Sequence, residues 1–368
     1  MLITQGIAGG RLTIDLAALR ANYRTLATRA APGECAAVVK ADAYGLGIAT
    51  VVPALQSEGC RSFFVARASE GVGLREIAPR ARILVLDGVH EGTLSATRVN
   101  GLVPVLGSLH QLGLWREAGG GEPCAIHVDT GMNRLGLAPG EFEAVAGDLR
   151  RLRVALLMTH PACADDPAHP LNALQRERFA VARALLPNVP ASYCNSAALL
   201  GDGPALDLAR PGIALYGGEA VNGVPALEPV VRLDARIVQR REVRAGEPVG
   251  YGATWVAKRP TRLAVCSVGY ADGYPRATGT GVPLRDAVPA AGWGAIGGVR
   301  VPIVGRISMD LTILDITGVP ADIQAREDHI ELIGPAVPLD EAARSAGTIG
   351  YELLTSLGPR YSRVLTGS

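Results

Sequence analysis

Residues 36–45 read AAVVKADAYG, an apolar run that ends in a lysine and a polar turn. A short, continuous apolar run that includes valines predicts a strand buried on both faces, as in parallel sheets. Lys40 stands where this strand ends. In barrels of parallel strands the active site forms at that end, so the position suits a reactive amine.

Similar apolar runs recur along the chain and alternate with segments that have the spacing of amphipathic helices. The predicted strands are 36–39, 63–66, 83–86, 102–105, 125–128, 154–159, 191–194 and 206–209. The predicted helices include 16–30, 108–118, 141–149 and 171–186. Strands that alternate with helices in this way predict a closed (β/α)8 barrel.

The pattern changes after residue 228, where β-rich runs alternate with Gly and Pro turns. Strands are predicted at 231–238, 263–268, 299–304, 312–316 and 330–333, and one helix at 340–346. This pattern is typical of a mostly antiparallel β domain. We therefore predict a barrel over residues 11–228 and a mostly β domain formed by residues 1–10 and 229–368.

Composition excludes several classes of protein. The 368 residues include 36 basic and 35 acidic side chains, a balance that offers no attraction to nucleic acid. With 48% apolar residues and no apolar run near the ~20 residues of a spanning helix, we expect no membrane association. The first ten residues lack a secretory signal, so we expect a cytoplasmic globular protein.

Cysteine and histidine spacing argues against disulfides and metal sites. The six cysteines lie far apart without a CxxC pair, which indicates reduced thiols. The six histidines form no HExxH or HxH pair, so no metal site is predicted. P-loop and GxSxG patterns are also missing from the sequence.

Lysine is rare in this chain, which narrows the candidates for amine chemistry to Lys40 and Lys258. Lys258 lies in VAKRP and is interpreted as a solvated turn, whereas burial beside an apolar strand would lower the pKa of Lys40. Polar residues follow later strands too, namely Asp129, Arg134, His160, Asn195, Ser196 and Arg210. An amine beside a phosphate site after the last two strands suggests pyridoxal 5′-phosphate, bound to Lys40 as a Schiff base.

Further residues could contribute to a phosphate site. Ser196 opens a short predicted helix at 195–200, whose first amides could bind phosphate oxygens. Gly212 follows a proline and would allow the backbone to approach a ligand closely. Tyr44 and Tyr351, both next to glycine, could add phenolic donors.

Nine segments resemble the alanine racemase family in order and spacing across nearly the whole chain. They are AVVKADAYGLG, HVDTGMNRLG, MTHPACAD, NSAA, ARPGIALYG, YGATW, GYADGY, GRISMD and GTIGYELLTSLGPRYSR. The family is a pyridoxal-phosphate barrel joined to a C-terminal β domain. Its members act as homodimers whose active sites include residues of both subunits.

The resemblance implies specific roles at the matched positions. Lys40 would bind the cofactor and act as the base on one face of the substrate, and Tyr270 of the partner subunit would act on the other. His160 would lie between Tyr270 and Arg210, and this arrangement would lower the pKa of the tyrosine. Arg210 would also contact the pyridine nitrogen. The other cofactor-binding positions would be Tyr44, Asn195, Ser196, Gly212, Ile213 and Tyr351. Arg134 and Met309, the latter also from the partner subunit, would recognise the substrate carboxylate.

The chain differs from the family pattern at one position that bears on the mechanism. Where many members have a carbamylated lysine that orients the arginine, this chain has His127. Either His127, a bound anion or a water would then steady Arg134. Asp42 and Leu46 also replace the usual Asn and His, which changes polarity without touching the reacting groups.

The resemblance predicts interconversion of L- and D-alanine, with D-alanine supplied for peptidoglycan. One alternative is a broader racemase that acts on serine or basic amino acids. Another is a non-catalytic pyridoxal-phosphate-binding barrel, which would lack the C-terminal domain and the second base, Tyr270. Inversion requires that second base because the proton leaves one face of the α-carbon and returns to the other.

Overall fold

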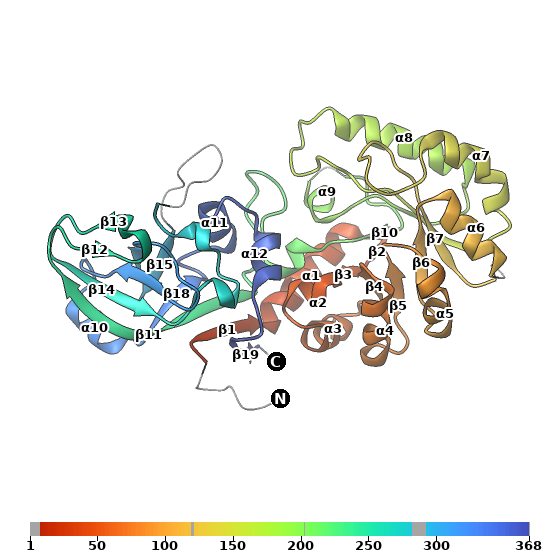
Figure 1. Cartoon of the computed structure of the whole chain (residues 1–368). Helices are drawn as coiled ribbons and strands as arrows, with labels where there is room; N and C mark the ends of the chain where they lie inside the picture. Colours follow the sequence, from red (N-terminus) through yellow and green to blue (C-terminus); the bar gives the residue numbers. More distant parts are fainter. Residues whose placement is uncertain (1–7, 119–120, 202, 282–291, 368) are drawn as a thin grey trace. The chain divides into compact units, whose positions relative to one another are not determined.

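A computed structural model describes residues 8–118, 121–201, 203–281 and 292–367. The chain divides into two compact units (Figure 1). The barrel unit comprises Leu19–Leu215 and Glu219–Leu227. The β unit comprises residues up to Ala18, Tyr216–Gly218 and residues from Glu228 onward.

Short parallel strands form the wall of the barrel unit. They are β2 (Glu34–Cys35), β3 (Ala37–Val38), β4 (Ser62–Val65), β5 (Arg82–Val85), β6 (Val103–Leu106), β7 (Cys124–His127), β8 (Val154–Met158), β9 (Ala191–Ser192) and β10 (Leu208–Ala209). Strand β3 lies within the first predicted strand, 36–39, and β2 precedes it, separated by Ala36. Each of the eight predicted strands thus overlaps an observed one.

Backbone pairing closes these strands into a ring. Seven of them form one parallel sheet in the order β3-β4-β5-β6-β7-β8-β9. Beyond β9, the Arg210 N–H donates to the Cys194 carbonyl at 2.8 Å, and β10 pairs in parallel with β2. The predicted (β/α)8 barrel is therefore confirmed.

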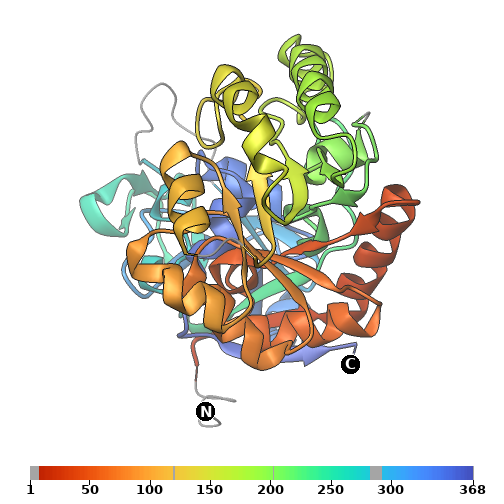
Figure 2. The same ribbon diagram turned by 90° about the vertical axis from the view of Figure 1, so that its right-hand side faces the viewer.

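Helices surround the strands, as Figure 2 shows for this unit. They are α1 (Leu16–Ala30), α2 (Lys40–Tyr44), α3 (Ile48–Ser57), α4 (Ala68–Ile77), α5 (Glu91–Val99), α6 (Leu109–Glu117), α7 (Pro139–Leu149), α8 (Leu171–Leu185) and α9 (Ser196–Leu200). Because helices cover the outside and side chains fill the inside, every residue of β4 and β6 is buried. This double burial explains why the strands are continuous apolar runs in the sequence.

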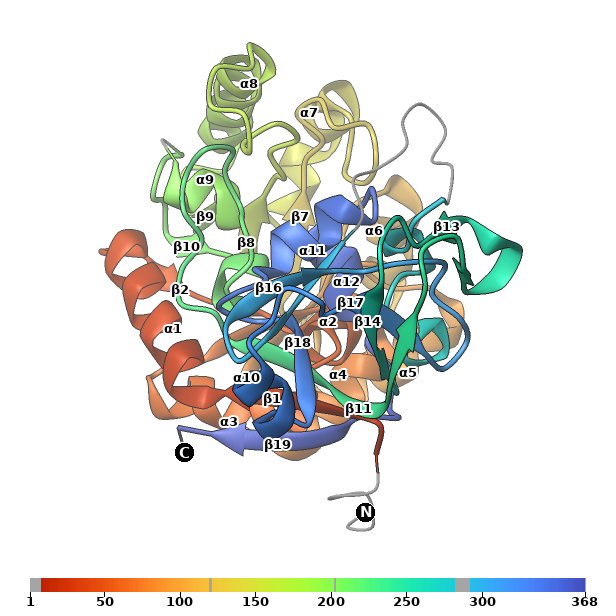
Figure 3. The same cartoon turned by 90° about the vertical axis from the view of Figure 1, so that its left-hand side faces the viewer.

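The β unit is built on one large, mostly antiparallel sheet (Figure 3). Its strands are β1 (Gly10–Asp15), β11 (Val231–Val243), β14 (Thr261–Cys266), β15 (Trp293–Ile296), β16 (Val299–Pro302), β17 (Thr312–Asp315), β18 (His329–Ile333) and β19 (Ser362–Thr366). A separate hairpin joins β12 (Pro248–Val249) to β13 (Trp255–Val256). The helices of this unit are α10 (Ala321–Arg326), α11 (Leu339–Ser345) and α12 (Gly350–Ser356). The predicted mostly β C-terminal domain is confirmed.

The division of the chain differs from the predicted boundary at residue 11. Strand β1 runs antiparallel to β11 and parallel to β19, so Gly10–Asp15 belongs to the β unit. Pairing with these two strands satisfies both edges of β1, a long-range arrangement that the sequence pattern of the segment does not contain.

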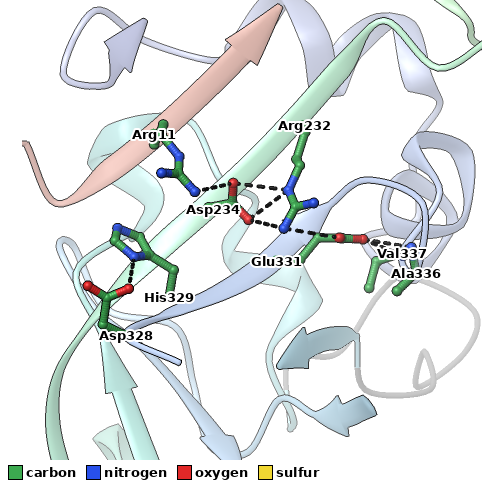
Figure 4. A network of polar contacts seen from close by, with 8 residues as sticks. All are labelled: Arg11, Arg232, Asp234, Asp328, His329, Glu331, Ala336 and Val337. Atoms are coloured by element: carbon green, nitrogen blue, oxygen red, sulfur yellow. Dashed lines mark hydrogen bonds and ion pairs between the residues drawn. The ribbon is translucent and has the colours of Figure 1, made fainter. Parts of the chain in front are cut away.

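Ion pairs to buried carboxylates link β1 and β18 to β11 (Figure 4). Asp234 on β11 is 2% exposed and accepts from Arg11 at 3.1 Å and from Arg232 at 2.9 Å. Arg232 also lies 3.7 Å from Glu331 on β18, whose carboxylate accepts the Ala336 N–H at 2.7 Å. These contacts join three strands of the sheet through two buried carboxylates, Asp234 and Glu331.

The cysteines are unpaired, and all but Cys163 are buried. Their thiols therefore contribute to the core as small apolar groups. No helix in the described part of the chain combines the length and apolar character needed to cross a bilayer.

Candidate active site

Lys40 lies at the carboxyl end of β3, where α2 begins. The side chain is half-buried. Burial and the nearby positive charge of Arg134 lower the pKa of Lys40, while Glu70 and Asp87 act in the opposite direction. The amine is thus closer to its neutral, nucleophilic form than that of a solvated lysine, as its position in the sequence predicts.

The turn after Lys40 is left-handed. Ala41, Asp42, Ala43 and Tyr44 all have φ between 54° and 56°, a conformation that non-glycine residues rarely adopt in succession. The Ala41 N–H donates to Glu70 Oε1 at 2.9 Å, and the Ile48 N–H donates to Asp42 Oδ1 at 2.8 Å. These contacts stabilise a strained turn that places the Tyr44 hydroxyl beside Gly212.

Tyr44, Ser196 and Gly212 meet after the last two strands. Ser196 Oγ accepts the Gly212 N–H at 2.8 Å, and a Cβ on Gly212 would lie 2.3 Å from Tyr44 Oη. Ile213, the next residue, is fully buried, and Asn195 Oδ1 caps α9 by accepting the Ala198 N–H at 2.9 Å. Two hydroxyls and a glycine backbone therefore form a cradle of the kind that holds a phosphate.

Arg210 carries a buried positive charge held by neutral oxygens. It donates to Ser192 Oγ, to the Thr159 carbonyl at 2.7 Å and to the Tyr193 carbonyl at 3.3 Å. Burial lowers the pKa of Arg210 to about 10, which leaves the guanidinium protonated at neutral pH. The network fixes the orientation of the side chain at the end of β10.

Two histidines flank this charge. Burial and the charge of Arg210 lower the pKa of His127 to about 4, with Arg134 adding to the effect and Asp129 opposing it. The pKa of His160 lies well below its ordinary value because of burial and the positive charges of Arg210, Arg134 and Lys40. Both imidazoles are therefore neutral at pH 7, and these side chains share one end of the barrel.

Arg134 lies on an exposed loop between β7 and α7. Asp129 Oδ1 shapes the loop by accepting the amides of residues 131–133 at 2.9, 2.9 and 3.2 Å. The Leu137 N–H returns to the His127 carbonyl at 2.8 Å, which closes the loop on β7. Arg134 thus belongs to the same strand end as His127.

The remaining predicted residues lie in the β unit. Tyr270 begins a short 3-10 turn, and its N–H donates to the Ser308 carbonyl at 3.1 Å. The Ala271 N–H donates to the Met309 carbonyl at 2.9 Å, so the segments that carry Tyr270 and Met309 lie side by side. Tyr270 is 42% exposed and Met309 54% exposed, and Tyr351 on α12 is also exposed.

Sequence reasoning missed some residues of this site. Glu70 and Asp87 each lie just beyond a predicted strand. The expectation that site residues follow the carboxyl ends of the strands would therefore have found them. Arg360, which binds Asp272 and Asp310 in the β unit, lies in the segment GTIGYELLTSLGPRYSR but does not follow a barrel strand. Among the described residues, no three His, Cys, Asp or Glu side chains are grouped to hold a metal ion.

Comparison with known proteins agrees with this division. The model "Alanine racemase, N-terminal domain" matches residues 14–220, and "Alanine racemase, C-terminal domain" matches residues 230–365. A curated relative from Agrobacterium fabrum, "Alanine racemase, biosynthetic", is 49% identical over 362 residues, which cover 96% of this chain and 93% of the relative. A second protein of that organism, "Alanine racemase, catabolic", is 45% identical over 368 residues, or 97% of this chain and 92% of the relative.

Solved structures give the same result. The alanine racemase of Bartonella henselae with covalently bound pyridoxal phosphate has a TM-score of 0.88 and 38% identity, and the match covers 97% of this chain and 99% of that one. The biosynthetic alanine racemase of Pseudomonas aeruginosa has a TM-score of 0.87 and 38% identity, with 98% and 100% covered. The family and enzyme class that the motifs predict are confirmed. The chain belongs to the alanine racemase family of enzymes.

Proposed function

We propose that this enzyme interconverts L- and D-alanine by two bases, Lys40 and Tyr270 of the partner subunit. The observation that carries the proposal is the half-buried Lys40 amine, whose pKa is lowered at a strand end shared with Arg134, His160 and Arg210. Family membership supports the reaction and the pairing of subunits.

The barrel residues fit pyridoxal 5′-phosphate. Tyr44, Ser196, Gly212 and Ile213 would hold the phosphate, since a side chain at position 212 would occupy the space beside the Tyr44 hydroxyl. When bound, the cofactor withdraws electrons from the substrate α-carbon and acidifies its proton. Asn195 and Tyr351 complete the proposed cofactor set.

Arg210 would contact the pyridine nitrogen. Its pKa of about 10 means that it donates a hydrogen bond without giving up its proton at neutral pH. A ring nitrogen that gains no proton is a weaker electron sink. We expect this to favour return of the α-proton over side reactions.

The two bases would act on opposite faces of the α-carbon. Lys40 can accept a proton because burial shifts its amine toward the neutral form. Tyr270 would act on the opposite face, and the neutral imidazole of His160 would align its phenol.

Arg134 and Met309 would bind the substrate carboxylate, which makes an amino acid the ligand class. The relative named biosynthetic is 49% identical and the relative named catabolic is 45% identical, so supply of D-alanine for peptidoglycan in the cytoplasm is proposed over alanine breakdown. A chiral assay with alanine, serine and arginine would separate an alanine racemase from a broader one.

The test of the two-base proposal is Tyr270→Phe in the holoenzyme. We expect racemisation in both directions to fall ~10²- to 10⁴-fold, the range that a lost general base produces. Tyr251→Phe, at another exposed tyrosine of the same unit, is the matched control. Wild-type rates in Tyr270→Phe would exclude the two-base mechanism, and cofactor binding without any racemisation by the wild type would favour the non-catalytic barrel.

A further inference from the structure

Two segments of the β unit that carry proposed site residues are in direct backbone contact. A Cβ on Gly269 would lie 2.4 Å from the Met309 carbonyl, so only glycine permits this approach. Hydrogen bonds from the Tyr270 and Ala271 amides reinforce it. The exposed side chains of Tyr270 and Met309 are therefore positioned mainly by how these two segments are held.

One guanidinium bridges the two segments from a third. Arg360 lies in the turn between α12 and β19, and its Nε is 3.1 Å from Asp272 Oδ1. Its Nη2 is 2.8 Å from Asp310 Oδ1. Asp272 lies two residues after Tyr270, and Asp310 directly follows Met309.

Asp272 is buried and held by backbone contacts, so the loss of Arg360 would change its position or its charge. Its side chain is 7% exposed, its Oδ2 accepts the Gly269 N–H at 2.8 Å, and its carbonyl accepts the Gly358 N–H at 2.9 Å. A buried carboxylate that loses its cation must move or take up a proton. The planar guanidinium can bind two carboxylates at once, whereas an ammonium is a single point charge on a flexible stem.

We propose that Arg360 is a positioning residue that fixes the Tyr270 phenol relative to Met309 by bridging Asp272 and Asp310. The inference rests on the proposed two-base function, because it assigns Arg360 a role through Tyr270. Arg360 touches neither substrate nor cofactor in this proposal.

The first experiment compares Arg360→Met and Arg360→Lys with a control, Arg259→Met. Arg259 has a similar ion pair in the same unit, 3.1 Å from Asp315. We expect Arg360→Met to lower kcat at least ~10-fold in both directions, Arg360→Lys to lower it less, and the control to stay near wild type. The visible spectrum of the bound cofactor should remain unchanged in all three.

The α-deuterium isotope effect reports which base is impaired. If Arg360 acts through Tyr270, removal of the α-proton by Tyr270 becomes rate-limiting, so the isotope effect rises with the deuterated enantiomer that Tyr270 deprotonates and falls with the other. A general loss of folded protein would leave both isotope effects unchanged. In the Tyr270→Phe background, Arg360→Met should add little further loss, whereas additive losses would overturn the proposal.

Amide hydrogen exchange gives a readout that is independent of activity. Arg360→Met should speed exchange in residues 269–273 and 308–311, and Arg259→Met should not. Asp310→Asn provides a second variant if Arg360→Met does not fold, because Asp310 is exposed and its loss leaves no buried charge. It should produce the same isotope signature at smaller amplitude, and normal isotope effects there would overturn the proposal.

The outcomes separate this inference from the proposed function. If Tyr270→Phe is fully active, the two-base function fails and the positioning role fails with it. If Tyr270→Phe is impaired while both Arg360 variants behave like Arg259→Met, only the positioning role fails.

Discussion

Gly212 is the residue on which the phosphate cradle depends most directly. In Gly212→Ala the new Cβ would lie 2.3 Å from the buried Tyr44 hydroxyl, so the tyrosine must move. We expect the dissociation constant for pyridoxal phosphate, measured by titration of the apoenzyme, to rise at least ~10-fold, or about 1.4 kcal/mol.

Gly73→Ala is the matched control for this prediction. Gly73 lies in α4 of the same unit, and a Cβ there would meet no atom within 4 Å. Alanine is favoured over glycine in helices, so this variant should bind the cofactor normally and be no less stable. Equal cofactor affinity in both variants would contradict the cradle.

His127 should make the stability of the enzyme depend on pH. Its pKa is lowered from an ordinary value of 6.5 to about 4, so the unfolded chain binds a proton that the folded chain does not as pH falls below 6.5. The stabilisation is complete above pH 6.5 and is lost as pH falls to about 4. Between pH 7 and 5 this predicts a loss of up to about 2 kcal/mol.

The measurement is the urea midpoint of the holoenzyme at pH 7 and pH 5, for wild type and His127→Gln. Glutamine has no proton to gain in this range, so its midpoint should fall less than that of the wild type. The effect of His127 on the pKa of His160 is smaller than the effects of burial, Arg210 and Arg134, so most of the His160 contribution cancels in the comparison. Parallel loss in the two proteins would show that His127 titrates normally.

At the scale of elements, the left-handed α2 turn depends on the start of α4. Glu70 caps its own helix by accepting the Ala66 N–H at 2.7 Å, and it also binds the Ala41 N–H next to Lys40. Glu70→Gln replaces one acceptor oxygen by a donor, so one of these bonds is lost. We expect a loss of about 1–3 kcal/mol in unfolding free energy and weaker cofactor binding.

Glu141→Gln tests whether that effect is local. Glu141 caps α7 in the same manner, with the Ala138 N–H donating at 2.9 Å, but α7 packs on α8, whereas Glu70 also binds the turn after Lys40. Thermal unfolding should detect a small loss in both variants. Cofactor affinity should fall only in Glu70→Gln, and an equal fall in both would contradict the coupling of α4 to α2.

Strands that are buried on both faces can be predicted from the sequence. Elements that form only by contact with distant segments of the chain cannot. Strands such as β4 and β6 are buried on both faces, and their composition alone indicates this. Strand β1 depends on pairing with β11 and β19 from the other end of the chain. The left-handed turn at Ala41–Tyr44 is likewise invisible, since alanine and tyrosine have no preference for positive φ.

The candidate site shows the same contrast. Lys40, His160, Ser196 and Arg210 were predictable because each follows a strand, and parallel strands bring their carboxyl ends together. Arg360 was not, because its bond to Asp310 joins residues 50 positions apart and only the folded chain shows which carboxylate it binds.

At the scale of the whole molecule, the proposed residues divide between the two units of each chain. Lys40, Arg134, His160 and Arg210 belong to the barrel unit, and Tyr270, Met309 and Tyr351 to the β unit. If two subunits share each active site, a dimer formed from two different inactive chains contains one site with both defects and one site with neither.

Mixing Lys40→Ala and Tyr270→Phe chains therefore tests the shared site. Each variant alone should be nearly inactive, and unfolding and refolding them together in equal amounts should restore about a quarter of wild-type activity, because half of the dimers are mixed and half of their sites are intact. If Tyr270 instead acts within its own subunit, every site keeps one defect and the mixture stays inactive. Wild-type enzyme refolded in the same way gives the reference activity. Mixed dimers purified by means of tags on the chains should reach about half of that activity.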